Sequence, residues 1–318
     1  MGKYILQRLL IAVPVIFGVT VVAFFIMTLA PGDAVDMLVS PGLSPQDIAL
    51  KKQSLGHDQP VYVQYVRWLQ EMLHGNLGYS FTNRQPVTER IFDRFGPTFT
   101  LAMSALLLSY IIAIPIGVLA AVRQYSVLDY SATIFSFLGV SIPSFFFGLL
   151  MIYFFSLKLD LFPTGGMQSV GQGFSWSDRL SHLVLPVIVL SLQNTGVVMR
   201  YTRSSMLDVV HQDYVRTARG KGLKKQAVLV RHGLRNSLIP VITLVGLQLP
   251  ILLSGAIITE QIFNWPGMGR LTVEAINQRD YPTIMGLNLM IALMVVAGNL
   301  VADVMYGLAD PRIRQQGG

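Results

Sequence analysis

The chain has 318 residues, of which 52% are hydrophobic and 13% charged, and its formal net charge is +7. A mean hydropathy of +0.53 is too high for an ordinary soluble domain and indicates a membrane protein. The sequence contains no cysteine, which excludes a disulfide framework and a cysteine-based metal site.

The hydrophobic residues are gathered into discrete runs that contain no Asp, Glu, Lys or Arg. A helix needs about 20 residues to cross the hydrocarbon, and it satisfies its own backbone there. The sequence therefore predicts an all-α membrane protein, a single transmembrane domain over residues 1–318 with six transmembrane helices. The predicted spans are 9–30, 98–122, 131–157, 183–199, 237–259 and 283–302.

Lys3 and Arg8 precede the first run, as the charged residues of a signal peptide would. The run is longer than the usual signal core of about 7–15 residues, and Pro31 follows its end, where cleavage would fall. We therefore expect it to be retained as the first span.

The loop 31–97 between the first two spans contains an amphipathic segment at 60–74. Pro60 suits the first turn of a helix, and Asp58 is a plausible cap. Trp68 and two tyrosines fit a helix at the membrane interface, and a packed extracytoplasmic subdomain fits equally well. The apolar stripe comprises Val61, Tyr62, Tyr65, Val66, Leu69, Met72 and Leu73. A second, short helix is expected after Pro86, leading into the second span at Pro97.

Several spans carry residues that interrupt a plain apolar helix. Pro115 and Pro143 fall inside the second and third spans. Such breaks and amides are tolerated at membrane depth where they face protein or a water-filled path. Either the fourth and fifth spans line a translocation path, or their glycines and small residues serve helix packing alone. The candidate path residues are Gln193, Asn194, Thr195, Thr243, Gln248 and Ser254.

Basic residues predict the orientation, because they collect in short cytoplasmic loops. If the N-terminus is inside, the cytoplasmic segments hold 14 Lys and Arg, nine of them between Arg200 and Arg235, whereas the short outer loops hold four. Both termini are then cytoplasmic. The cluster in the cytoplasmic loop 200–236 can be explained as a topology signal alone.

Residues 213–233 of this loop have a further pattern. Asp213 can cap a helix in which Val215, Ala218 and Gly222 form a stripe of small and apolar residues. An amphipathic helix is predicted after Gly222. A short helix, a glycine turn and a second helix make a rigid knob. A nucleic-acid surface would more often offer several aromatic side chains for base stacking, and this stretch offers only Tyr214.

The sequence offers little for catalysis. Its five histidines lie in loops or at span edges, and it contains no His-Glu-x-x-His, Gly-x-Ser-x-Gly or phosphate-binding Gly-x-x-x-x-Gly-Lys-Ser/Thr motif. We expect no catalytic residue, no metal site and no cofactor in this chain. A carrier driven by protons or sodium usually keeps ionisable groups in its spans, and these spans have none. Energy for uphill transport would have to come from a cytoplasmic partner. A non-transporting membrane scaffold is a further alternative.

The run from Asp213 to Leu223, followed by "HGLRNSLIP" at 232–240, resembles the signature loop of ABC-importer permeases, specifically of the dipeptide/oligopeptide branch. Ala218, Gly222 and Leu234 match the general importer motif. Arg216, Thr217, His232 and Arg235 stand where that motif has Glu, Ala, Ile and Pro, as is usual in the peptide branch. "EQIFNWPGMGRL", "LADPRIR" and stretches of the first span and outer loop are also similar to this branch, so the resemblance covers nearly the whole chain.

The resemblance implies a multi-pass subunit of a bacterial or archaeal inner membrane. Its expected partners are a homologous permease, two ATP-binding subunits that use ATP and Mg, an extracytoplasmic substrate-binding protein and the lipid bilayer; nucleic acid is not expected. The implied ATPase-coupling residues are Asp213, Tyr214, Arg216, Thr217, Ala218, Arg219, Lys221 and Gly222. Ala218 and Gly222 are expected to let the partner approach closely. Peptides are the expected substrate, with nickel chelates, glutathione or sugars as alternatives within the branch.

Overall fold

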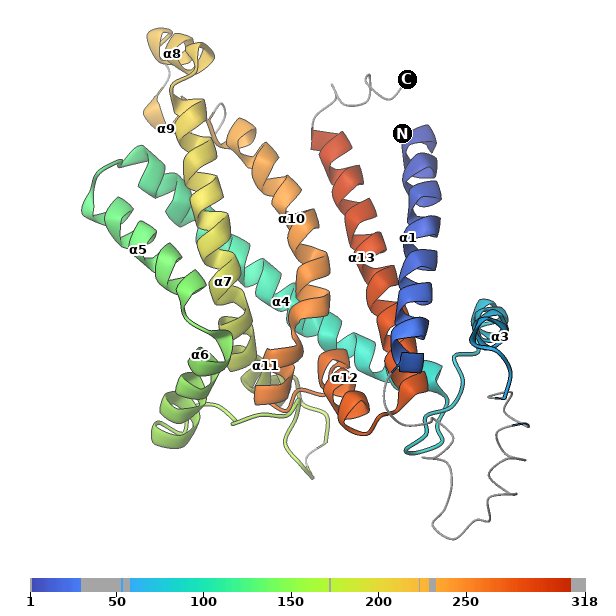
Figure 1. Cartoon of the computed structure of the whole chain (residues 1–318). Helices are drawn as coiled ribbons and strands as arrows, with labels where there is room; N and C mark the ends of the chain where they lie inside the picture. The colour runs from blue at the N-terminus through green and yellow to red at the C-terminus, as the bar shows by residue number, and fades with distance from the viewer. Residues whose placement is uncertain are drawn as a thin grey trace.

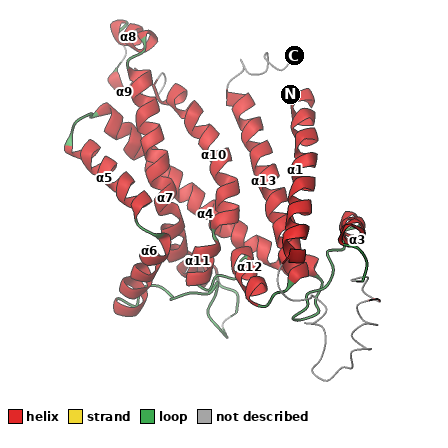
Figure 2. Cartoon of the chain, in the orientation of Figure 1, coloured by secondary structure: helices red, strands yellow, loops and turns green. Residues whose placement is uncertain are grey.

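The computed structural model describes residues 2–29, 53, 58–171, 173–222, 224–228 and 233–309. Within these ranges the chain is helical and forms no strand; Tyr79 and Pro86 make one isolated bridge (Figure 2). The helices are α1 Gly2–Leu29, α3 Val61–Leu73, α4 Val87–Val122, α5 Val127–Ser141, α6 Ser144–Met151, η1 Ile152–Lys158 (a π-helix), α7 Trp176–Val210, α8 Asp213–Gly220, α9 Lys225–Val228, α10 Arg235–Gly255, α11 Ile257–Ile262, α12 Met268–Asn277 and α13 Tyr281–Ala309.

The long helices form a bundle with two different ends (Figure 1). The start of α1, the end of α13 and the pair α8–α9 lie at one end, and α3, α6, α11 and α12 lie at the other. Helix α7 is central, since it packs against α4, α5 and α10, while α13 packs against α10 and α1.

Small residues allow several of these helices to touch backbone to backbone. A Cβ on Gly117 of α4 would lie 2.8 Å from the carbonyl oxygen of Met199, and one on Gly196 of α7 would lie 2.7 Å from that of Ser136. A Cβ on Gly246 of α10 would lie closer still to Ala302 of α13. These glycines therefore serve helix packing, as small residues commonly do in membrane proteins.

Four described helices are long and apolar enough to cross a membrane: α1 (over Ile5–Leu29), α4, α7 and α13 (over Tyr281–Met305). They contain the first, second, fourth and sixth predicted spans, except for Ala30, which is outside the described residues. Helix α10 covers most of the fifth predicted span, but its described apolar stretch, Asn236–Gln248, is shorter than the helices that qualify as candidate spans. The count of six spans therefore stays a prediction.

The third predicted span, 131–157, is not one straight helix. Helices α5 and α6 are bent by 102° at a break, where Ile142 has the extended angles φ −78° and ψ 124°. A residue before proline is pushed out of the helical region, and Pro143 follows Ile142. Counted as one broken span, this pair raises the number of candidate spans to five.

The expectation of a separate short helix after Pro86 is wrong. Helix α4 begins at Val87 and continues through Pro97 and Pro115 to Val122. In long membrane helices, neighbouring helices can satisfy the groups that a proline frees, so a proline does not have to end the helix.

Candidate coupling hairpin and translocation path

Helices α8 and α9 of the predicted signature loop form a compact hairpin. Val215 and Ala218 of α8 are only 2% and 7% exposed, and they pack with Val228 of α9 and with Val209. Gly222 makes the turn between the helices with φ +80°, a left-handed conformation that favours glycine. Asp213 lies in the first turn of α8, inside the helix and not before it as expected of a cap.

This packing gives Ala218 a role within the chain. Its side chain faces the interior of the hairpin and holds α8 against α9, while its expected role in close approach by a partner stays a prediction. The helical pattern identified which residues share a face, but it did not show that this face meets the chain itself.

The outward face of α8 carries the other predicted coupling residues. Tyr214, Arg216, Thr217 and Lys221 are exposed, and Asp213 is exposed beside them. Thr217 Oγ1 donates a hydrogen bond to the carbonyl oxygen of Asp213 at 2.9 Å. The side chains of Arg219, Leu223 and His232 lie outside the described residues. What α8 offers to a partner is thus a short helix with cationic and hydroxyl groups.

The hairpin is attached to both α7 and α10. Only His211 and Gln212 separate α7 from α8. Asn236 Nδ2, at the start of α10, donates a hydrogen bond to Tyr214 Oη at 3.0 Å. Ser205 Oγ of α7 donates to the carbonyl oxygen of Ser237 at 2.9 Å. The hairpin is therefore in direct contact with two long helices.

An ion pair braces the same end of α7 against α5. Arg203 Nη2 donates to Asp129 Oδ2 at 2.8 Å, and the Arg203 Nε group contacts the other carboxylate oxygen. The side chain of Asp129 is buried, so the two-point contact is a strong one. The sequence analysis missed this pair; opposite charges just outside two neighbouring spans were the available signal.

The predicted path residues of α7 do not share one surface. Gln193 is exposed, Asn194 is half-buried, and Thr195 is buried. Thr195 Oγ1 donates to the carbonyl oxygen of Ser191 at 2.8 Å, and Asn194 Nδ2 donates to that of Leu190 at 3.2 Å. Thr195 is thus satisfied within its own helix, and Gln193 is the α7 amide that faces outward.

The path residues of α10 are also partly engaged. Gln248 is buried and accepts a hydrogen bond from Tyr110 Oη of α4 at 3.2 Å. Thr243 is half-buried, and the side chain of Ser254 lies outside the described residues. Gln248 therefore links α10 to α4, a role that sequence reasoning could not find because its partner is 138 residues away.

At the opposite end, Glu260 of α11 organises the segment that follows α10. Its carboxylate accepts hydrogen bonds from Thr98 Oγ1 at 2.7 Å and from the Arg270 N–H at 3.0 Å. Trp265 Nε1 donates to the carbonyl oxygen of Pro97 at 3.0 Å. Burial raises the pKa of Glu260 above its usual value, although the hydrogen bonds oppose that shift. Glu260 thereby fastens α11 and α12 to α4.

A second buried carboxylate holds the start of α13. Asp280 accepts hydrogen bonds from Arg90 Nη1 and Thr283 Oγ1, both at 2.8 Å, from the Phe81 N–H at 3.0 Å, and from the Ser80 hydroxyl. The loop before α4 is thereby pinned to α13.

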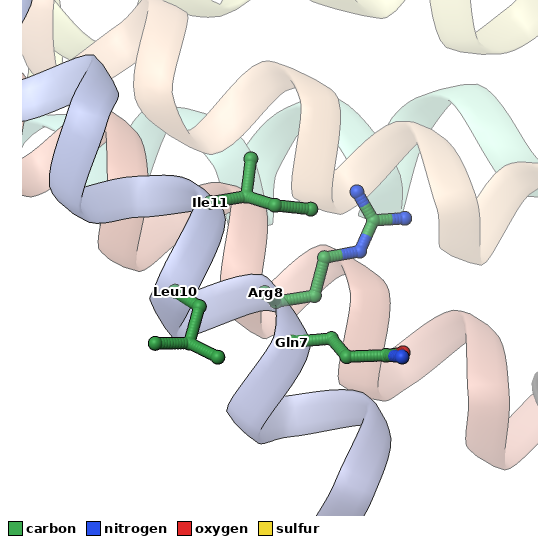
Figure 3. Close-up of a pocket in the computed structure, with 4 residues that line it drawn as sticks. All are labelled: Gln7, Arg8, Leu10 and Ile11. Atoms are coloured by element: carbon green, nitrogen blue, oxygen red, sulfur yellow. The ribbon is translucent and has the colours of Figure 1, made fainter.

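An open pocket of about 540 Å³ lies beside α1 near its N-terminal end. Figure 3 shows its lining residues Gln7, Arg8, Leu10 and Ile11. Arg8 Nε is paired with Asp303 Oδ2 of α13 at 3.0 Å. The described lining of this pocket includes none of the predicted path residues. In the described part of the chain, no three His, Cys, Asp or Glu residues gather as metal ligands would.

Comparison with known proteins decides the family. Residues 113–315 match the model of the binding-protein-dependent transport system inner membrane component, and residues 1–102 match the N-terminal model of the same membrane component. The chain belongs to this family. The resemblance to ABC-importer permeases of the dipeptide/oligopeptide branch is thereby confirmed, and the chain is a permease subunit of a membrane transport system.

Relatives match over nearly the whole length. The oligopeptide transport system permease protein AppB of Bacillus subtilis is 45% identical over 314 residues, which cover 98% of this chain and 99% of AppB. The dipeptide transport system permease protein DppB of Escherichia coli is 38% identical, with 99% and 100% covered. The glutathione transport system permease protein GsiC of Salmonella paratyphi A is 40% identical, with 99% of both chains covered.

A solved structure supports the fold. A chain of the MetNI methionine ABC transporter, in an inward-facing conformation, matches with a TM-score of 0.57 at 13% identity. The match covers 69% of this chain and 96% of that one. The expected all-α membrane permease fold is confirmed.

Proposed function

We propose that this permease subunit imports di- and oligopeptides together with a homologous permease, and that α8 is the seat of an ATP-binding subunit. Two such subunits bind ATP and Mg, and a substrate-binding protein delivers peptide at the end that carries α11 and α12. The names of the relatives, which are oligopeptide, dipeptide and glutathione permeases, support short peptides as the substrate class.

The observation that carries this proposal is that α8 is attached to α7 and α10 while its charged face is exposed. Val215 and Ala218 pack inside the hairpin, while Tyr214, Arg216 and Thr217 of α8 and Lys221 directly after it are exposed. The neighbours α7 and α10 of this hairpin are the helices that hold the proposed path residues. Closure of two ATPase subunits would draw the seated helices together and move α7 and α10 with them. Arg216 and Lys221 suit an acidic patch on the ATPase surface.

The proposal makes the α8 end cytoplasmic, together with both chain termini. The concentration of Lys and Arg between Arg200 and Arg235 supports this orientation, since cytoplasmic loops are enriched in basic residues. Asp213 stabilises α8, because its negative charge lies at the positive N-terminal end of the helix dipole.

The test uses vesicles that contain the complete transporter in their membrane. The binding protein is supplied on the side of α11 and α12, and ATP on the side of α8. Uptake of a labelled dipeptide should require ATP. Arg216→Glu combined with Lys221→Glu should weaken ATPase association by about 2 kcal/mol, roughly thirtyfold, and uptake should fall in parallel. Lys158→Glu, an exposed charge reversal at the other end, is the matched control and should transport normally.

Equal ATPase association of the double variant and the Lys158→Glu control would overturn the docking role of α8. Uptake of a nickel chelate in place of the dipeptide would overturn the substrate class while leaving the ATP-driven import in place. Dipeptide uptake that proceeds without ATP would point to an ion-coupled carrier.

A further inference from the structure

Helix α3 is fastened crosswise to the first span. In Figure 1, α1 runs vertically, while α3 beside it is seen nearly end-on. Tyr65 is the buried residue of α3; its Oη lies 3.0 Å from Thr20 Oγ1, and its ring meets the Phe24 ring edge-on at 5.3 Å. The Trp68 ring lies 6.1 Å from that of Phe24. These contacts fix the position of α3 relative to α1.

The contacts also fix how far along α1 the small helix lies. Thr20 comes nine residues and Phe24 five residues before Leu29, the last residue of α1. At 1.5 Å per residue, these positions are about 14 Å and about 8 Å inside the end of the helix. The run 9–30 is free of charged residues. Helix α3 therefore lies against the apolar part of the span and not beyond its end.

The apolar face of α3 is wider than the part that α1 covers. Tyr65, Trp68 and Leu69 pack against α1. Tyr62, Val66 and Leu73 lie next to them at i, i+4 and i+11, and they are 67%, 48% and 73% exposed. On the opposite side of the helix, Arg67 and Glu71 are exposed polar residues. One half of a continuous apolar stripe is therefore left uncovered by the chain.

We propose that Tyr62, Val66 and Leu73 are immersed in the lipid bilayer, at the boundary between headgroups and acyl chains. Lipid is the occupant that fits, because α3 lies at the level of Phe25, Ile26 and Leu29, which are exposed apolar residues of the candidate membrane span α1. An amphipathic helix that lies across a span, with polar residues on its other face, has the geometry of an interfacial anchor. Arg67 is placed to meet lipid phosphate groups.

This surface gives α3 a task that is separate from the transport path. It anchors the level of α1 in the bilayer through the Tyr65–Thr20 contact, since neither helix can change depth without the other. The inference rests on the membrane location of the chain and not on its substrate or on the docking role of α8.

The test uses the absence of native cysteine. Single variants Val66→Cys and Leu73→Cys are spin-labelled, and the complete transporter is assembled with its partners in liposomes. Collisions of each label with oxygen, which concentrates in the bilayer, are compared with collisions with a water-soluble nickel chelate. Val13→Cys, on an exposed face of α1, is the lipid-facing control, and Glu71→Cys is the control on the polar face of α3.

Labels at positions 66 and 73 should resemble the label at 13, with oxygen collisions dominant, while the label at 71 should be reached mainly by the chelate. Labels at 66 and 73 that the chelate reaches as readily as it reaches 71 would place the stripe in water and overturn the inference. Labels at 66 and 73 that neither probe reaches would also overturn it, because a protein surface would then cover the stripe.

Discussion

At the end of the bundle that carries α11 and α12, Glu260 and Asp280 are completely buried, and each gathers hydrogen-bond donors from distant parts of the chain. The α8–α9 hairpin at the other end is closed by Val215, Ala218 and Val228. A buried carboxylate with several donors holds one arrangement firmly, because any loosening leaves polar groups unpaired. Three small aliphatic side chains hold the hairpin weakly, and its charges remain available. The comparison teaches that buried hydrogen bonds hold one end in place, while the other keeps exposed charges that, on the proposed function, an ATPase subunit contacts.

The largest effect is expected from removing the carboxylate of Glu260. Glu260→Ala leaves the Thr98 hydroxyl and the Arg270 N–H without their acceptor in a buried site, at about 1–3 kcal/mol for each group. We expect the purified complex to lose about 3 kcal/mol or more of stability, which thermal unfolding in detergent can measure. Glu260→Gln keeps one acceptor oxygen and should fall between Ala and the native residue.

Glu274→Ala is the control for this prediction. Glu274 makes an ion pair with Arg270 in the same segment, but both side chains are about a third exposed, so the loss should be under about 1 kcal/mol. Equal destabilisation by Glu260→Ala and Glu274→Ala would show that the buried carboxylate does not hold this end.

An intermediate effect is expected at the turn of the hairpin. Gly222→Ala adds a Cβ to a residue with φ +80°, which costs about 1–2 kcal/mol even though no atom lies within 4 Å of the added group. The hairpin should open more often, seen as faster hydrogen exchange in α8, and the ATPase should bind less tightly. Gly220→Ala is the matched control because Gly220 also has open space but no positive φ. The same loss in both variants would contradict a role for the turn.

The smallest effect is expected from Lys224→Gln. This exposed residue follows the turn, outside α8. Exposed ion pairs are typically worth under about 1 kcal/mol, so ATPase affinity should change less than about fivefold. A collapse of transport in this variant, measured beside Gly222→Ala, would mean that charge and not shape governs the hairpin.

The positions of the long helices could be predicted because an uncharged apolar run of about 20 residues has few other structural solutions. Prolines were harder to interpret. Helix α4 continues through Pro97 and Pro115, whereas the chain bends sharply just before Pro143. The local sequence does not show which prolines break a helix and which do not. Whether a proline breaks a helix depends on what the neighbouring helices can satisfy.

The candidate sites were predictable only in part, for the same reason. The helical period correctly grouped Val215 with Ala218. Their burial against Val228 depends on the turn between the two helices, and the helical period says nothing about the geometry of that turn. Gln248 was found as a polar residue in an apolar span, while its partner Tyr110 lies on another helix. Sequence patterns identify unusual residues, and the tertiary structure decides whether they face a path or one another.

The glycines at the helix crossings also limit how the bundle can move. Where Gly117 meets Met199 and Gly196 meets Ser136, backbone touches backbone, so no layer of side chains can change rotamer to let the helices slide. We therefore expect α4, α5 and α7 to move as one unit, and α10 to move with α13 through Gly246. A rotation of one unit against the other would shear the Tyr110–Gln248 hydrogen bond, which joins α4 to α10.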